Sequence, residues 1–385
     1  MRIFHLLTDR TYPFHRGGLE ASVYRIASII SEIEACKVII YYTEKPELQF
    51  MEEKSGEIRF ISLNEQLDEV KKPLEGYKRD NADNRVTYLI LKNHINEYLG
   101  LGENILLSFY LTVKGFVMQR IADDLHIPHI ALVRGSDYSA DSFNYFRLSA
   151  MRYVCENATR IVTTNNEQHK GLINMFGLNE QKIYVCHNSV NAKVPLIKPG
   201  RREKHYFFTD VGYSFKKGTH LLLDAFEQIV IKGGHNPFVL HICGETTESE
   251  KEYWEQRLRL LQHKYKKHFI FDSYLKDVTA IFDICSCYIF PSLAEGCSSA
   301  LSKALMSGLP VITTRTGIVD ELPEEMKKGV EVINPGNISP IKKSVESILN
   351  TEETVCYEAR AKSVYQYLSR ENEKKKWTEI INLDS

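Results

Sequence analysis

Short apolar runs alternate with longer amphipathic segments along almost the whole chain. The first run, residues 2–7, precedes an amphipathic segment at residues 20–33. In that segment Val23, Ile26 and Ile30 recur at helical spacing. Strand-like runs that alternate with helices are typical of a parallel sheet with crossover helices. The pattern therefore predicts an α/β protein.

The alternation occurs twice, on either side of one interruption. Residues 191–204 contain two prolines, a glycine and a basic cluster, and this composition predicts an interdomain linker. Before the linker we predict strands at residues 37–42, 58–62, 104–108, 129–133, 160–164 and 182–186, and helices at residues 86–99 and 113–125. After it we predict strands at residues 205–211, 238–243, 269–271, 287–290 and 310–314, and helices at residues 219–231, 248–265, 278–283 and 298–307. A chain of 385 residues exceeds what one core usually serves, which also favours two domains.

Composition and charge limit the classes of function. Lysine and arginine number 49 against 50 aspartates and glutamates, so the formal net charge is −1. Nucleic-acid binding needs a basic balance or stripe, so we expect no nucleic-acid partner. The N-terminal apolar run is too short for a signal peptide, and no segment approaches the roughly 18 apolar residues of a membrane span. The eight cysteines lie mostly in apolar runs. We expect a cytoplasmic protein with buried thiols.

Two glycine turns between a strand and a helix are candidate phosphate sites. Gly17-Gly18 opens the first predicted helix, where free backbone N–H groups and the helix dipole favour an anion. Residues 211–218, Val-Gly-Tyr-Ser-Phe-Lys-Lys-Gly, place Lys217 at a similar turn. The alternatives are glycines needed only for a tight turn and an exposed lysine without a role. The spacing is not that of a Walker loop.

The strongest segment is residues 290–313, where a strand, a loop with Glu295, a helix start at Ser298-Ser299 and a second strand follow one another. Gly308 ends the helix and Pro310 precedes the next strand. The helix N-terminus is suited to a diphosphate, and a carboxylate accepts hydrogen bonds from sugar hydroxyls. The alternative is an ordinary βαβ unit whose acid complements the helix dipole.

In this order the segments resemble family 4 of the retaining glycosyltransferases, the glycosyl transferases group 1. The turn Arg134-Gly-Ser-Asp137 and the stretch around Asn188 match as well, so the resemblance covers nearly the whole chain. It implies the GT-B fold, an α/β architecture of two Rossmann-like parallel-sheet domains facing each other across a cleft. The implied domains are an acceptor domain at residues 1–192, a donor domain at residues 203–367, and a helix at about 368–385 that crosses back to the first domain.

The resemblance implies transfer of a sugar from a UDP- or GDP-linked nucleotide-sugar to a saccharide or lipid-linked hydroxyl acceptor, with retained anomeric configuration. Assembly of a cell-surface polysaccharide or glycolipid is the expected context. No metal or other cofactor is implied. The implied catalytic residues are Glu295, Lys217 and Arg134. The implied donor-binding residues are Gly17, Gly18, Gly212, Tyr213, Lys217, Glu295, Gly296, Cys297, Ser298, Ser299 and Lys303. The implied acceptor residues are Arg134, Asp137 and Asn188.

Three positions depart from the family pattern. Lys303 stands where the family usually has a second Glu that holds the ribose, Tyr213 where it has Arg, and Arg134 where His is common. Lysine cannot accept ribose hydroxyl protons but can attract phosphate. We therefore expect Lys303 and Lys217 to form a phosphate clamp. Arg134 is suited to a phosphate or carboxylate. The alternative for Arg134 is an ion pair with Asp137 or another acid.

These departures keep other functions open. The main alternative is a catalytically inactive glycosyltransferase-like partner subunit that binds the acceptor. A nucleotide-sugar 2-epimerase is a further one, although its acid–base residues are not recognisable. A dehydrogenase would need G-x-G-x-x-G, which Gly17-Gly18 does not provide. Peripheral membrane contact is considered through residues 71–79 or 113–120.

Overall fold

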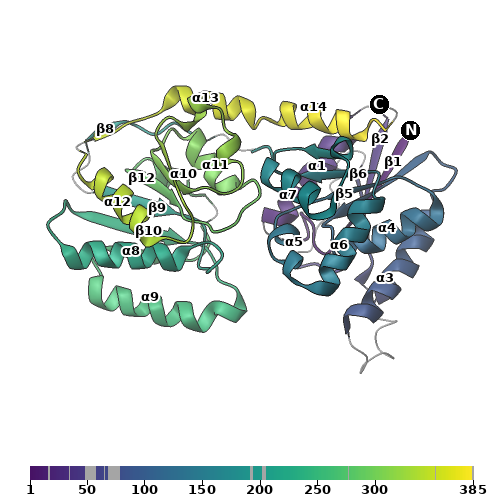
Figure 1. Ribbon diagram of the computed structural model, residues 1–385, viewed down its shortest axis with the longest axis horizontal. Helices are drawn as coiled ribbons and strands as arrows, with labels where there is room; N and C mark the ends of the chain where they lie inside the picture. Colours follow the sequence, from purple (N-terminus) through teal and green to yellow (C-terminus); the bar gives the residue numbers. More distant parts are fainter. Residues whose placement is uncertain are drawn as a thin grey trace. The chain divides into compact units, whose positions relative to one another are not determined.

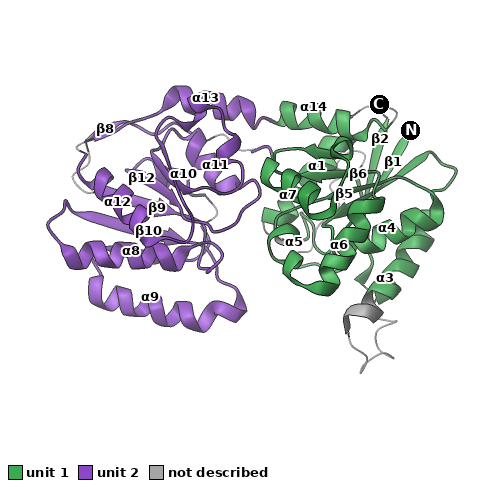
Figure 2. Ribbon diagram, viewed as in Figure 1, with its two compact units in different colours: residues 1–188, 370–385 green, residues 189–369 purple. Residues whose placement is uncertain are grey.

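The computed structural model describes residues 1–15, 18–33, 35–47, 58–64, 66–67, 79–190, 194–201, 205–275, 277–351 and 353–383. Within them, the chain forms two separate parallel sheets with surrounding helices (Figure 1). The chain divides into two compact units (Figure 2). Unit 1 consists of residues 1–188 and 370–385, and unit 2 of residues 189–369.

Unit 1 contains a seven-stranded sheet in the order β3-β2-β1-β4-β5-β6-β7, and all its neighbouring strands are parallel. The strands are β1 (Arg2–Thr8), β2 (Cys36–Tyr42), β3 (Ile58–Ser62), β4 (Glu103–Phe109), β5 (His129–Leu132), β6 (Arg160–Thr163) and β7 (Ile183–Val185). The helices are α1 (Gly18–Ser31), α3 (Arg79–Asn96), α4 (Lys114–Leu125), α5 (Ser136–Ser139), α6 (Tyr145–Asn157), α7 (Asn166–Phe176) and α14 (Arg370–Ile381). Strand order reverses between β1 and β4, and ligands of such sheets bind outside the carboxyl ends of the strands at this point.

Unit 2 repeats the arrangement with six parallel strands in the order β11-β10-β9-β12-β13-β14. The strands are β9 (His205–Thr209), β10 (Phe238–Cys243), β11 (Phe269–Asp272), β12 (Cys287–Phe290), β13 (Val311–Thr314) and β14 (Val330–Ile333). The helices are α8 (Thr219–Lys232), α9 (Lys251–Tyr265), α10 (Thr279–Phe282), α11 (Ser299–Met306), α12 (Ile338–Leu349) and α13 (Glu358–Tyr367). Short 3-10 turns occur at Asp141–Phe143, Glu180–Lys182, Glu248–Glu250, Val319–Glu321 and Glu324–Lys327. The predicted fold class of two Rossmann-like parallel-sheet domains is confirmed.

The described part of the predicted linker belongs to unit 2. In residues 194–201, Ile197 is 3% exposed and its N–H donates to Ser307 O at 2.9 Å. Gly200–Arg201 forms β8, which pairs antiparallel with β15 (Glu353–Thr354). An apolar side chain and a strand pairing therefore fix this segment to unit 2. Residues 191–193 and 202–204 lie outside the described residues.

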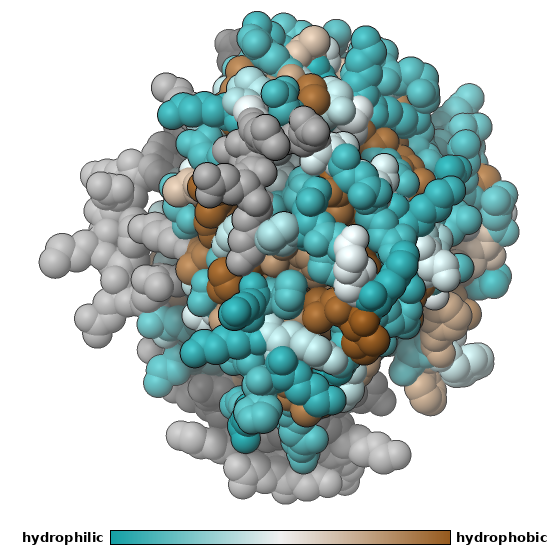
Figure 3. Space-filling model, turned by 90° about the vertical axis from the view of Figure 1, so that its left-hand side faces the viewer, coloured by the Kyte–Doolittle hydropathy of each residue, from teal (hydrophilic) through white to brown (hydrophobic). Residues whose placement is uncertain are grey.

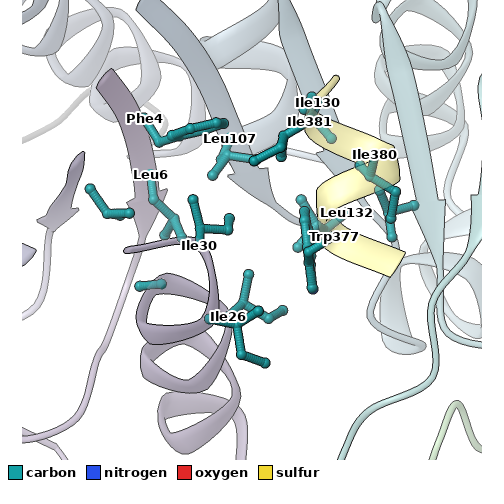
Figure 4. Close-up of a cluster of buried hydrophobic side chains, with 14 of the residues drawn as sticks. Phe4, Leu6, Ile26, Ile30, Leu107, Ile130, Leu132, Trp377, Ile380 and Ile381 are labelled. Atoms are coloured by element: carbon teal, nitrogen blue, oxygen red, sulfur yellow. The ribbon is translucent and has the colours of Figure 1, made fainter. Parts of the chain in front are cut away.

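The C-terminal helix α14 contributes to the core of unit 1 (Figure 4). Its Trp377, Ile380 and Ile381 are almost fully buried. They share one apolar cluster with side chains of α1 and of the central strands, among them Phe4, Leu6, Ile26, Ile30, Leu107, Ile130 and Leu132. Burial of this apolar surface holds the last residues of the chain on the first sheet.

The face of the molecule drawn in Figure 3 is mostly hydrophilic, with apolar residues in separate patches. In the described part of the chain, no helix is long and apolar enough to cross a membrane. In the stretch 113–120, considered for membrane contact, Val113 and Arg120 are exposed, and the contact stays a hypothesis. Val117 and Met118 are buried, and Lys114 pairs with Asp9 at 2.7 Å. Residues 71–78 of the other stretch lie outside the described residues.

Replacing Trp377 by Ala is expected to destabilise the protein by about 3–5 kcal/mol, because a large buried ring leaves a cavity between α14 and the sheet. Urea denaturation followed by circular dichroism measures this change. Lys375→Ala, at an exposed position of the same helix, is the matched control and should have little effect. Equal stability of the Trp377 variant and the control would contradict this packing.

Candidate functional site

The loop after β9 contains two glycines at which a side chain has no room. Gly212 and Gly218 have φ values of 79° and 70°. A Cβ on Gly212 would lie 2.6 Å from Glu245 O, and one on Gly218 would lie 2.0 Å from Pro291 O. The loop therefore packs directly against the segments that follow β10 and β12. This close packing places Lys217 at the carboxyl edge of the second sheet.

Lys217 and Glu295 form an ion pair that joins the loops after β9 and β12. Ser292 Oγ donates to the same Glu295 Oε1 at 3.1 Å. The Lys217 side chain is 35% exposed and that of Glu295 is 14% exposed. The sequence-predicted lysine and carboxylate are thus brought together, and both remain reachable from solvent.

Helix α11 begins a few residues after Glu295 in the sequence. Its N-cap is Ser298, whose Oγ accepts a hydrogen bond from Leu301 N at 3.4 Å. Ser302 N donates to Ser298 O at 3.1 Å. In the described part of the chain, the N–H groups of Ser299 and Ala300 have no hydrogen-bond partner. The Ser298 hydroxyl is therefore used to cap the helix, while two backbone N–H groups remain for an anion.

Asp210 lies at the end of β9 among these charges, and sequence reasoning missed it. Tyr288 Oη donates to Asp210 Oδ1 at 2.5 Å. Burial raises the pKa of the Asp210 carboxyl, and the Tyr288 hydrogen bond and the charges of Lys303 and Lys217 oppose the rise. Lys303 forms no ion pair with any described residue, so its charge acts on Asp210 from a longer distance. An acid directly after a buried strand was the signal in the sequence.

Tyr213 does not face the site. Its side chain is 6% exposed, and its hydroxyl lies 2.8 Å from Ile242 O and 2.9 Å from Asp272 O. Its N–H donates to Glu245 O at 3.0 Å. Neither the hydroxyl nor the N–H is left for a donor, so the predicted donor contact of Tyr213 is not supported. This residue is part of the core instead.

The other implied donor residues have mixed placements. Gly17 lies outside the described residues, and Gly18 begins α1 in unit 1 with open space around its missing side chain. Gly296 lies between Glu295 and α11, and a Cβ on Gly317 would lie 2.4 Å from Gly296 O. Cys297 is partly buried against the apolar cluster of unit 2. The carbonyl of Gly296 therefore lies against Gly317, in the loop that follows β13.

In unit 1, Asp137 organises the turn after β5. Its carboxylate accepts hydrogen bonds from the N–H groups of Arg134 at 3.0 Å and Gly135 at 2.9 Å. The N–H groups of Leu111 and Tyr138 also donate to it, each at 3.2 Å. Asp137 is fully buried, and burial raises the pKa of its carboxyl, while these hydrogen bonds lower it in part. It is a structural acid rather than an acceptor contact.

Arg134 and Asn188 meet in a cluster of polar side chains that sequence reasoning only partly found. Asn188 Oδ1 accepts from Arg134 Nη2 at 3.0 Å and from Arg25 Nη2 at 2.7 Å. Arg25 Nε donates to both oxygens of Glu373, at 3.0 and 3.3 Å. The Arg134 guanidinium also lies over the Phe109 ring, 4.6 Å from its centroid. No ion pair joins the side chains of Arg134 and Asp137, so the part of that alternative that names Asp137 is wrong.

Comparison with known proteins relates these elements to glycosyltransferases. Residues 197–366 match the family model described as Glycosyl transferases group 1. The chain is 25% identical over 277 residues to an uncharacterized glycosyltransferase of Methanocaldococcus jannaschii, covering 70% of this chain and 72% of that protein. It is 22% identical over 222 residues to the O-antigen chain mannosyltransferase RfbU of Salmonella typhimurium, covering 55% and 57%.

Solved structures share the fold at low sequence identity. Anabaena HepE in complex with UDP superimposes with a TM-score of 0.71 at 13% identity, covering 98% of this chain and 99% of that one. The lipopolysaccharide outer core galactosyltransferase WaaB gives a TM-score of 0.71 at 14% identity and covers all of both chains. These similarities show the GT-B fold.

Tyr213→Phe is expected to lower the free energy of unfolding by about 1–2 kcal/mol, because the two carbonyls that its hydroxyl faces lose a buried donor. Affinity for UDP or GDP is expected to stay unchanged. Thermal denaturation and titration calorimetry measure the two quantities, with Tyr274→Phe at an exposed position as the control. A tenfold loss of nucleotide affinity at unchanged stability would return Tyr213 to the site.

Proposed function

We propose that this protein transfers a sugar from a nucleotide-sugar donor to a hydroxyl of a saccharide or lipid-linked acceptor and retains the anomeric configuration. The observation that carries the proposal is the Lys217–Glu295 pair at the carboxyl edge of the second sheet. The lysine can attract the diphosphate of a nucleotide-sugar, and the carboxylate can accept hydrogen bonds from the sugar hydroxyls.

The diphosphate is assigned to Lys217, Lys303 and the start of α11. A lysine ammonium attracts phosphate oxygens, and unpaired N–H groups at a helix start add donors of the same polarity. The N–H groups of Ser299 and Ala300 support this role, because they have no partner among the described residues. Positive charge that is already in place stabilises the negative charge that develops on the departing diphosphate.

Glu295 is assigned to the hydroxyls of the transferred sugar. An ionised carboxylate only accepts hydrogen bonds, and sugar hydroxyls supply donors. In the structure, Glu295 Oε1 accepts hydrogen bonds from Lys217 and Ser292. When a donor binds, Lys217 turns to the diphosphate and the sugar hydroxyls replace it at Glu295. The ion pair thus keeps both groups placed before the donor arrives.

Position 303 carries a lysine, so it offers no carboxylate to the ribose. Asp210 is the other acid that could accept hydrogen bonds from the ribose hydroxyls. It is held by Tyr288 and lies in the field of Lys303. We assign Asp210 to hydroxyls of the nucleotide on the same grounds as Glu295.

Independence from metal ions stays a prediction, as do the cytoplasmic location and the role in polysaccharide or glycolipid assembly. The sequence similarity to the O-antigen mannosyltransferase RfbU supports the role in polysaccharide assembly.

Lys217→Ala is expected to weaken UDP or GDP binding on the order of 10–100-fold, because a charge-assisted hydrogen bond contributes about 1.5–3 kcal/mol. Lys303→Ala should weaken it in the same direction. Lys216→Ala, at the exposed neighbouring lysine, is the matched control for the loss of one positive charge. Titration calorimetry measures the affinities. Unchanged binding by the Lys303 variant would remove that residue from the clamp.

The transferred sugar is expected to keep the anomeric configuration that it has in the donor. Proton NMR of the early product, in buffer with and without EDTA, reports the configuration and the need for a metal together. Glu295→Gln should still bind the nucleotide, because Lys217 stays available to the diphosphate, but should lose transfer, because the carboxylate assigned to the sugar is gone. An inverted product would overturn the retaining mechanism. Tight nucleotide binding without transfer to any acceptor would favour the inactive partner subunit.

A further inference from the structure

The turn after β5 in unit 1 contains a cation, Arg134, that forms no ion pair with a carboxylate of any described residue. Arg134 is partly exposed, and the Phe109 ring covers one face of its guanidinium. Its Nη2 donates to Asn188 Oδ1 at 3.0 Å. Within the described residues, its Nε and Nη1 have no hydrogen-bond partner. A guanidinium has five N–H donors, so most of them remain for a ligand.

The acid nearest to this cluster is already used by the other arginine. Glu373 is 4% exposed, and both its oxygens accept from Arg25 Nε. Arg25 Nη1 also donates to Ser22 Oγ at 3.2 Å. Arg134 therefore shares with Arg25 only the neutral oxygen of Asn188. Two guanidinium groups meet there, and one carboxylate compensates one of them.

The two guanidinium groups at Asn188 repel each other. Burial and then the positive charge of Arg25 lower the pKa of Arg134 to about 10, while the charges of Glu373 and Asp137 oppose them. Asp137 itself is occupied by four backbone N–H groups. A cation held near another cation is stabilised when an anion completes the cluster.

A strained residue marks the same place. Tyr110, directly after β4, has a φ of 144°, which non-glycine residues rarely adopt. Its phenol lies within the electrostatic reach of Arg134 and Asp137, and burial raises its pKa to about 12. Within the described residues, its hydroxyl has no hydrogen-bond partner. Strain of this kind persists where a site needs a particular backbone placement.

We propose that Arg134 binds an anionic group, a phosphate or a carboxylate, on the acceptor. The guanidinium supplies donors for two oxygens of that group, and the Tyr110 hydroxyl, within electrostatic reach of Arg134, is a further candidate donor. Asn188 and the Arg25–Glu373 ion pair are positioning residues, because Asn188 Oδ1 accepts a hydrogen bond from Arg134 and is itself held by Arg25. This inference rests on the proposed function in one respect: it names the substrate class of the acceptor.

The test measures anion binding with the nucleotide site blocked. Wild-type protein saturated with UDP or GDP is titrated by calorimetry with inorganic phosphate, glucose 6-phosphate, glucuronic acid, decyl phosphate and glucose. We expect the anionic probes to bind and glucose not to bind. Arg134→Gln should weaken the anionic probes at least tenfold. Arg134→Lys, which keeps the charge but loses the planar fork, should give an intermediate loss. Arg152→Gln, at an exposed arginine of unit 1, is the matched control.

Stability and nucleotide binding separate the outcomes. The melting temperature and nucleotide affinity of Arg134→Gln should stay near those of the wild type. Anion binding that is the same in wild type and Arg134→Gln would overturn the inference, as would equal binding of glucose and glucose 6-phosphate. Preference for decyl phosphate or for glucose 6-phosphate distinguishes a lipid from a soluble acceptor.

If no nucleotide binds, the proposed function fails separately. The same titration is then repeated with Lys217→Ala/Lys303→Ala, which removes the phosphate-attracting lysines of unit 2. Binding of phosphate that still depends on Arg134 would support the anion site by itself. Absence of that binding would overturn it.

Discussion

The ion pair between Lys217 and Glu295 is the interaction on which the candidate site depends. It joins loops that follow two neighbouring strands, and it exists because Gly212 and Gly218 let the first loop pack against backbone atoms. A side chain at either glycine would push the loop outward and separate the pair. The core of unit 2 thereby controls the spacing of two functional groups that each lie on a loop. This is how a rigid sheet can carry a site made of loop residues.

The two units offer different chemistry at the carboxyl ends of their sheets. Unit 2 places Lys217, Lys303 and the start of α11 near Glu295 and the partly buried Asp210, an arrangement suited to a diphosphate joined to hydroxyl-rich groups. Unit 1 gathers Arg134 and Arg25 around Asn188, with Glu373 as the carboxylate that Arg25 uses. Each unit thus leaves positive charge for a different anion. Lys303 stands where the resembled family usually has a glutamate, and a lysine there would attract phosphate instead of accepting hydrogen bonds from hydroxyls.

The hydrophobic pattern predicted every strand of the two large sheets except β14, because a buried parallel strand is a short continuous apolar run. It did not predict α6 and α7, since few of their side chains are buried and the patterns are correspondingly weak. Glu295, Lys217 and Arg134 were found because each follows a strand next to a glycine. The burial of the Tyr213 side chain was not predicted, because the pattern of a glycine turn does not show which of its side chains point into the core. The Arg25–Glu373 pair joins residues 348 positions apart, and no local signal in one sequence reveals such a contact.

The central claim is that the charges of unit 2 hold a nucleotide through its diphosphate. Titration calorimetry of the wild-type protein with UDP, GDP, uridine and guanosine tests it most directly. One diphosphate is expected to bind about 100-fold more tightly than its nucleoside, since two charge-assisted contacts exceed the roughly 2.7 kcal/mol that this ratio needs. The difference should shrink as ionic strength rises. Equal affinity for nucleoside and diphosphate, or no binding of either, would contradict the account.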